Sequence, residues 1–158
     1  MNIKILDRFK DYVRHNYNNC DLTNPVICSD IHCSISYLYD ILNFEYYYSC
    51  MQYVRYFRVL KSMEFIICNQ TKKVYRNVGY KSSSAFYRNF LKVTGFDARC
   101  FYADELKEYF EEYKGIFPVI YGIAAKDPKE AIEFIIDNSS IRSILLDKQS
   151  TKQKRKKL

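Results

Sequence analysis

The sequence predicts an all-α protein: two helix-turn-helix subdomains joined by a long helix, with a small C-terminal extension. Apolar residues recur every three or four positions along most of the 158-residue chain, which is the helical period. The chain has only four glycines, and two of them lie at the ends of one compact pattern in residues 78–102. That pattern reads as a tight turn, a capped amphipathic helix and a helix stop, as in a helix-turn-helix.

The N-terminal residues predict three helices. Residues 3–17 carry a helical stripe of apolar side chains and form a first amphipathic helix. Asn24 is expected to cap a short helix over residues 25–30, with Pro25 in its first turn. Ser34 is expected to cap the next helix, residues 34–43, whose buried side is apolar. The buried side consists of Leu38, Ile41 and Leu42.

A single long helix is predicted over residues 49–68. Its apolar residues recur every three or four positions and it contains neither glycine nor proline. Lys72 and Lys73 are then expected to begin a short helix that ends before Gly79.

The second helix-turn-helix is predicted from residues 78–102. Serines that can cap a helix follow Gly79, and Phe86 and Phe90 lie four apart on one helical face. The helix is expected to stop at Gly95. Its other faces then present short polar and basic side chains, as a recognition helix does in a DNA groove. These side chains are Ser84, Tyr87, Arg88 and Lys92.

Residues 78–96 resemble the signature of the AraC/XylS family of bacterial transcription factors. Ten residues stand at matching positions. The chain departs from the family at Asp97 and Ala98, where Thr-Pro is usual, and at Phe101 and Tyr102, where Tyr-Arg is usual. The matching residues are Val78, Gly79, Tyr80, Ser82, Ser84, Phe86, Arg88, Phe90, Gly95 and Phe96.

Residues 22–66 are similar to the first helix-turn-helix of the same family without a gap. Three positions depart from the family pattern: His32 and Tyr47 stand where glycine is common, and Asp40 stands where arginine is frequent. The matching residues are Ser34, Tyr37, Leu38, Ser49, Tyr53, Arg55 and Arg58.

The resemblance implies that residues 1–102 form a DNA-binding domain. Its two recognition helices, residues 34–43 and 83–93, are expected to enter successive major-groove segments about one helical turn apart. The implied base contacts are Ser36, Tyr39 and Asp40 in the first helix and Ser83, Ser84, Tyr87 and Arg88 in the second. Arg88 is the strongest candidate, because arginine to guanine is the commonest specific contact. The expected phosphate contacts are Arg55, Arg58, Lys72, Lys73, Lys81 and Lys92.

Residues 103–150 lie outside the resemblance. A helix that ends at Gly115 and another over residues 128–137 are predicted. The apolar residues 116–125 remain unclassified, and residues 139–147 fit a helix or a strand, so the extension is α or α+β. The basic residues 151–158 are expected to form a disordered tail.

The net charge of +7 is unevenly distributed along the chain. Residues 1–102 carry 14 Lys and Arg against 8 Asp and Glu, residues 103–150 carry 6 against 10, and residues 151–158 carry 5 against none. A basic first part suits a surface that faces phosphates. The acidic extension favours packing or contact with protein.

Several classes of function have no support in the sequence. It contains no glycine-rich phosphate loop and no hydrolase or metalloprotease motif, so we expect neither an enzyme nor a cofactor. The six cysteines show no C-x-x-C pair and only two histidines are present, which predicts buried free thiols and no metal site. No apolar run spans a membrane and no signal peptide is visible, so we expect a cytoplasmic protein.

The sequence therefore predicts a sequence-specific regulator of transcription that binds double-stranded DNA. Because no sensing domain precedes residues 1–102, the resemblance suggests an activator that needs no small-molecule effector and contacts RNA polymerase. An alternative is a protein-binding anti-regulator that antagonises a related DNA-binding protein, since Asp40, Tyr47 and Ala98 depart from the family pattern.

Overall fold

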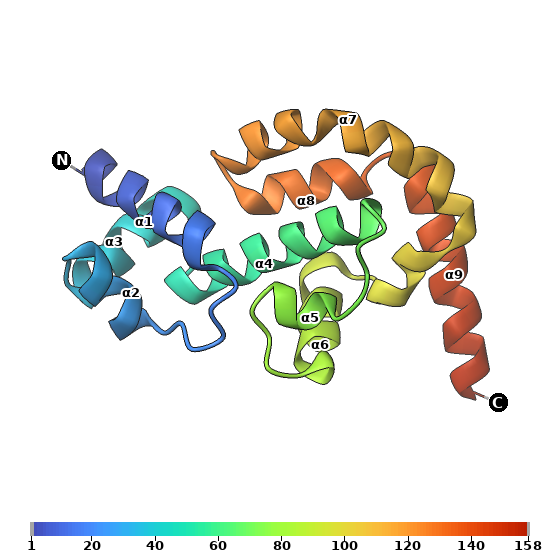
Figure 1. The fold of residues 1–158 in the computed structure, drawn as a ribbon, viewed down its shortest axis with the longest axis horizontal. Helices are drawn as coiled ribbons and strands as arrows, with labels where there is room; N and C mark the ends of the chain where they lie inside the picture. The colour runs from blue at the N-terminus through green and yellow to red at the C-terminus, as the bar shows by residue number, and fades with distance from the viewer. Residues whose placement is uncertain (1, 158) are drawn as a thin grey trace.

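The protein is all-helical throughout the part that the structure, a computed structural model, describes, residues 2–157 (Figure 1). No strand occurs in that range, which confirms the predicted fold class. The elements are α1 (Asn2–Asn16), α2 (Asn24–Ile31), α3 (Ile35–Tyr46), α4 (Cys50–Ile67), α5 (Val74–Asn77), α6 (Ser83–Thr94), the 3-10 turns η1 (Ala98–Tyr102) and η2 (Asp104–Leu106), α7 (Lys107–Ala124), α8 (Pro128–Ile136) and α9 (Ser139–Lys157).

The first subdomain consists of α1, α2 and α3 with the first half of α4. Thr23 caps α2, one residue before the predicted cap, and its Oγ1 accepts from the amide of Val26 at 3.4 Å. Ser34 caps α3 as predicted. The core under these helices is apolar and mostly aliphatic, with buried aromatic rings at Phe9, Tyr53 and Phe57. Its fully buried members include Phe9, Val13, Ile27, Leu38, Leu42 and Val54.

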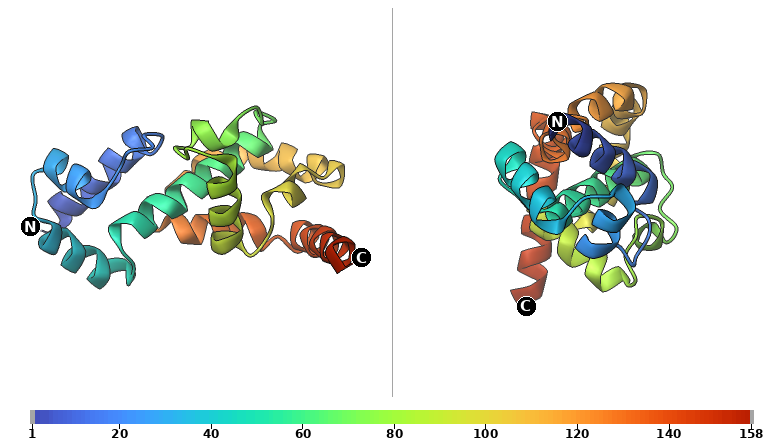
Figure 2. Two further views of the ribbon diagram at one scale, coloured as in Figure 1. Left: turned by 90° about the horizontal axis from the view of Figure 1, so that it is seen from below. Right: turned by 90° about the vertical axis from the view of Figure 1, so that its left-hand side faces the viewer.

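Helix α4 links the two subdomains, as the sequence predicts. Ser49 and Gln52 form a reciprocal capping box at its start, which fixes the first turn. Its first half packs into the first core through Val54 and Phe57. Its second half packs into the second core through Leu60 and Met63. In Figures 1 and 2, α4 runs through the middle of the molecule with α1, α2 and α3 at one end.

The second subdomain consists of α5 and α6 on one side of α4 (Figure 1). Gly79, with φ of 95°, lies in the turn before α6, and Gly95, with φ of 80°, ends α6. Both glycines therefore adopt backbone angles that a side chain disfavours. Phe86 and Phe90 point into the core, edge to face with rings 5.8 Å apart.

The C-terminal helices do not form a separate unit. Buried residues of α7, α8 and α9 join those of α4 and α6 in one continuous core. Helices α7 and α8 lie on the opposite side of α4 from α5 and α6 (Figures 1 and 2). The extension is therefore α rather than α+β, and residues 139–147 are helical.

Two sequence predictions in this region are wrong. Gly115 does not end a helix: α7 continues through it and through Pro118 to Ala124. Buried residues on both sides of these two positions hold the helix in place, which offsets the poor helix propensity of glycine and proline. The basic tail is also not irregular, because α9 continues to Lys157.

Polar contacts tie the first subdomain to the C-terminal helices. The hydroxyl of Tyr48 donates to Asp127 at 2.6 Å, and the ammonium of Lys10 donates to the carbonyl of Ala125 at 2.8 Å. Asp127 also caps α8, where it accepts from the amide of Lys129 at 3.0 Å. The start of α8 is therefore fixed by the end of α3, some 80 residues earlier.

Candidate nucleic-acid interface

Helix α6 is held so that one side faces solvent over its whole length. The hydroxyl of Ser82 accepts from the amide of Ala85 at 3.2 Å, which starts the helix where the sequence predicts. Since Phe86 and Phe90 are buried, the side opposite them is exposed. Of the four predicted base-contacting residues, Ser84 and Arg88 are exposed on that side, and Ser83 is exposed at the first turn of the helix.

The fourth predicted residue, Tyr87, is half-buried and has an unexpected neighbour. The guanidinium of Arg99, in η1, lies over the Tyr87 ring with 4.2 Å between its central carbon and the ring centroid. The same guanidinium forms an ion pair with Asp97 at 3.2 Å. Arg99 thus adds an exposed positive charge beside α6. No sequence signal marks this residue, because it lies in a 3-10 turn whose approach to α6 depends on the fold.

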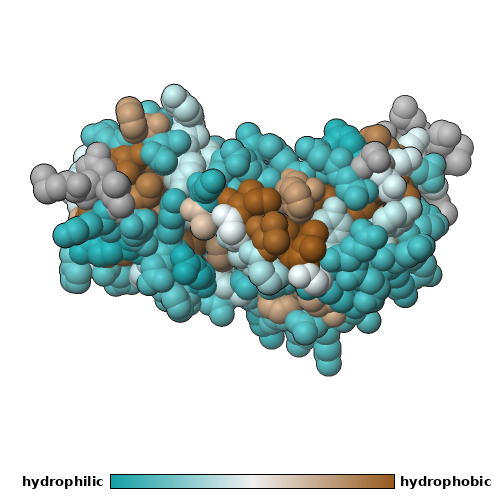
Figure 3. Space-filling model, turned by 90° about the horizontal axis from the view of Figure 1, so that it is seen from above, coloured by the Kyte–Doolittle hydropathy of each residue, from teal (hydrophilic) through white to brown (hydrophobic). Residues whose placement is uncertain are grey.

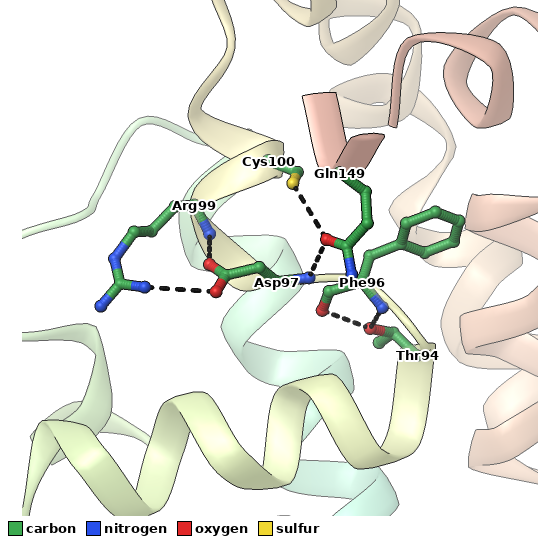
Figure 4. Close-up of polar contacts among 6 residues, drawn as sticks. All are labelled: Thr94, Phe96, Asp97, Arg99, Cys100 and Gln149. Atoms are coloured by element: carbon green, nitrogen blue, oxygen red, sulfur yellow. Dashed lines mark hydrogen bonds and ion pairs between the residues drawn. The ribbon is translucent and has the colours of Figure 1, made fainter. Parts of the chain in front are cut away.

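The turn after α6 explains the departures at Asp97 and Ala98 (Figure 4). Asp97 caps η1 by accepting from the amide of Arg99 at 2.8 Å. Its own amide donates to the side-chain oxygen of Gln149 in α9 at 3.2 Å, and the thiol of Cys100 donates to the same oxygen at 3.5 Å. Ala98 is fully buried. An acidic cap and a bond to α9 therefore stabilise a turn in which the family usually has Thr-Pro.

The lysines predicted to face phosphates are exposed around α5 and α6. They are Lys72, Lys73, Lys81 and Lys92. Lys81 forms an ion pair with Asp21 of the first subdomain at 3.1 Å, and this bond raises the pKa of the lysine. Both side chains are exposed, and such surface pairs contribute little free energy. Lys81 can therefore exchange this carboxylate for a phosphate.

The structure corrects the prediction for Arg58. This side chain is only 8% exposed. Its guanidinium donates to the carbonyls of Tyr17 and Asn19, both at 2.8 Å, and lies over the ring of Tyr80. Burial lowers the pKa of Arg58. The residue therefore joins the two subdomains and does not face solvent. Arg55, one turn earlier on α4, is half-buried and stays a candidate for phosphate contact.

The predicted base-contacting residues of the first subdomain also lie on one exposed face. Ser36, Tyr39 and Asp40 are all exposed on α3, and Leu38 is buried on its opposite side. The helix ends at Tyr47, which adopts the left-handed conformation with φ of 61° where the family commonly has glycine. His32 does the same at the end of α2, with φ of 59°.

The exposed face of α3 is aromatic and apolar. Tyr39 is 58% exposed, Phe44 81% and Tyr47 86%, and Ile35 is also exposed. Such large apolar side chains in water usually mark a contact surface. Asp40 and Glu45 are the charged side chains of this helix, so its face is acidic.

The two subdomains differ sharply in charge. Residues 1–54 contain four lysines and arginines, all of them in α1, and six acidic residues. Residues 55–92 contain nine lysines and arginines and one glutamate. Because phosphate neutralisation supplies most non-specific affinity for DNA, the second subdomain is electrostatically suited to a duplex and the first is not.

The described residues offer little support for a metal site, a disulfide bond or a membrane span. No group of three or more metal-ligating side chains occurs among the residues that the structure describes. None of the six cysteines forms a disulfide bond; Cys28, Cys50 and Cys100 are buried, whereas Cys20 is exposed. No helix in the described range is long and apolar enough to cross a membrane.

Comparison with solved structures supports the fold. The chain is similar to the C-terminal domain of AraT, a response regulator from Geobacillus stearothermophilus, with a TM-score of 0.59 and 21% identity. The match covers 62% of this chain and 83% of that domain. At this identity the likeness shows a shared fold. No protein-family model matches the sequence, and no curated protein does.

Proposed function

We propose that this protein binds double-stranded DNA in a sequence-specific way and regulates transcription, with α6 as the main reading helix. The exposed surface of α6 carries this proposal: Ser83, Ser84 and Arg88 are exposed on this helix. Exposed lysines lie on the helix at Lys92 and in the segments before it at Lys72, Lys73 and Lys81. Arginine at such a position reads guanine, and the lysines hold the phosphates. The fold shared with the AraT domain, from a response regulator, supports the same role.

The finer points of the proposal follow from the resemblance described above. The protein acts in the cytoplasm as an activator, without a small-molecule effector, and contacts RNA polymerase. Helix α3 enters a second major-groove segment about one turn away. Since the α3 face is acidic, we expect it to contribute selectivity and little affinity. Asp40 is suited to accept from the amino group of a cytosine.

Selection from a randomised duplex library at about 150 mM salt tests the proposal. We expect an enriched site with two elements about one helical turn apart. Arg88→Ala should blur the element read by α6 and weaken binding about 5- to 150-fold, the usual worth of one bidentate base contact. Lys92→Ala is the matched control. It should lower the affinity for all DNA sequences equally and reduce the salt dependence of binding by about one phosphate contact. No enrichment with the wild-type protein would refute sequence-specific binding.

The first subdomain supports a second candidate function. The acidic, aromatic face of α3 carries no basic residue, so it suits a cationic protein surface better than a duplex. In this alternative, α3 docks on a related DNA-binding regulator and antagonises it.

Asp40→Lys separates the two candidates. If α3 lies in the groove, the new positive charge should raise the affinity for DNA and increase the salt dependence by about one phosphate. If α3 docks on a protein, DNA binding should not change, and a purified double helix-turn-helix regulator should bind the wild-type protein more tightly than the variant. Phe44→Ala should weaken the same protein complex, since Phe44 is among the most exposed apolar side chains.

A further inference from the structure

The outward face of α7 is an apolar surface with no neighbour among the described residues. The inward side of this helix packs against α4 and α8. The opposite side exposes Gly115, Pro118, Val119 and Gly122, and Val119 is 58% exposed. Figure 3, which views the molecule from the α7 side, shows a hydrophobic patch near the middle of this face, surrounded by polar surface. Contiguous apolar surfaces of this kind mark sites of protein association.

Charges flank this surface in a symmetric arrangement. Residues of a helix are about 100° apart, so Glu112 and Lys126, each seven positions from Val119, both lie within about 20° of it. With a rise of about 1.5 Å per residue, each lies about 10 Å along the helix from Val119. Lys126 belongs to the turn that continues α7, where its amide donates to the carbonyl of Ile123 at 3.0 Å. Both charged side chains are exposed, and neither has an ion-pair partner among the described residues.

A second copy of the chain matches this arrangement. Consider an antiparallel dimer whose two-fold axis passes beside Val119. A residue that follows Val119 by a given number of positions then faces, in the other copy, the residue that precedes Val119 by the same number. Lys126 of each copy then faces Glu112 of the other. Gly122 faces Ile116, so a residue without a side chain lies opposite a half-buried apolar one. The Glu112 and Lys126 pairs therefore make this register complementary to itself in charge.

A groove beside the helix adds to this fit. It has a volume of about 450 Å³ and lies between α7 and α8. Glu112, Ile116 and the exposed ring of Phe134 line it. In the antiparallel pair, the C-terminal end of α7 from one copy, which carries Ile123 and Lys126, would lie beside this groove of the other copy.

We propose that the α7 face, defined by Glu112, Ile116, Val119, Gly122 and Lys126, binds the same face of a second copy in an antiparallel two-fold dimer. The acidic residues of α7 and its neighbouring turn oppose a membrane surface or a nucleic acid as the partner.

The dimer is independent of the proposed DNA binding. Helix α7 lies across α4 from α6, so the paired helices leave the exposed face of α6 free (Figure 1). A dimer would carry two reading helices and therefore increase the avidity for paired DNA sites.

Sedimentation velocity without DNA tests the proposal. The wild-type chain of 19.0 kDa should show a concentration-dependent change to twice that mass. Glu112→Lys and Lys126→Glu should each weaken self-association about tenfold, because each places like charges together twice in the dimer. An equimolar mixture of the two variants should restore association, since every contact between the two different chains again joins opposite charges. Glu45→Lys, the same charge change on α3, is the control and should leave association unchanged.

Three results would overturn the proposal. The first is a wild-type chain that remains a monomer up to about millimolar concentration, which is beyond the range of specific association. The second is a dimer that tolerates both charge reversals and Val119→Lys. The third is weakening by each reversal without recovery in the mixture, because recovery depends on the antiparallel register. Far-UV circular dichroism checks that each variant is folded. Because the substituted positions are exposed, we expect every variant to fold, so a change in self-association reports on the interface.

Discussion

Replacing Gly79 by alanine should destabilise the protein far more than the same change at Gly95. Both glycines have positive φ, 95° and 80°, so both substitutions introduce backbone strain. Their surroundings differ. A Cβ on Gly79 would lie 2.4 Å from the carbonyl oxygen of Tyr17 and 2.8 Å from Nε of Arg58, whereas a Cβ on Gly95 meets nothing within 4 Å.

The expected magnitudes follow from these contacts. Gly95→Ala carries only the cost of the left-handed backbone, about 1 kcal/mol. Gly79→Ala carries the same cost and a collision with a main-chain oxygen, which cannot rotate away. Relief of the collision requires the loop at Tyr17 to move away from Arg58. That movement breaks a charged hydrogen bond of 2.8 Å, which adds about 3 kcal/mol. We therefore expect a loss of about 4 kcal/mol at Gly79.

Urea unfolding followed by circular dichroism at 25 °C measures both free energies of unfolding. A loss at Gly79 that exceeds the loss at Gly95 by about 2 kcal/mol or more would support the reasoning. Equal losses would refute it, because they would show that the contact between the α6 turn and the first subdomain contributes nothing. A typical domain has a stability of only about 5–15 kcal/mol, so the larger loss is readily measured.

Three further predictions use the same unfolding assay. Arg58→Met should cost about 3 kcal/mol, because it leaves two carbonyls without their donors, while Arg55→Met, on the same helix, should change stability by less than about 0.5 kcal/mol. Tyr48→Phe should lower the free energy of unfolding by about 1–2 kcal/mol, since it removes the hydrogen bond to Asp127. The exposed neighbour Tyr47 provides the control, and equal stabilities of Tyr48→Phe and Tyr47→Phe would show that the bond to Asp127 does not stabilise the fold. The contribution of Tyr12 to stability should be constant below about pH 10 and fall as the pH rises towards 12. Burial and the bond to Asp30 raise the pKa of Tyr12 from 10.0 to about 12, so the phenol keeps its proton in the folded state after the unfolded state has lost it. Tyr12→Phe should reduce the slope of this fall by about one proton, and an unchanged slope would exclude Tyr12 as a contributor.

The sequence determined the local structure of residues 1–102. Side-chain caps at Ser34, Ser49 and Ser82 begin their helices where predicted, and Gly95 ends α6. These signals can be found in sequence because capping bonds join residues that are three or four positions apart. Exposure of the predicted residues on α3 and α6, apart from the half-buried Tyr87, also follows from sequence, since the apolar period fixes which side of a helix is buried. Their contacts with DNA remain predictions.

Tertiary structure decided the role of every residue whose partners lie far along the chain. Arg58 has the spacing of a surface residue on α4, yet the carbonyls of Tyr17 and Asn19, about 40 positions earlier, draw it inward. Gly115 has the local features of a helix end, yet packing against α4 and α8 continues α7 through it. Periodicity and capping describe only neighbours within about one or two turns. Contacts over longer separations depend on how the helices pack, and this packing also creates the exposed face of α7.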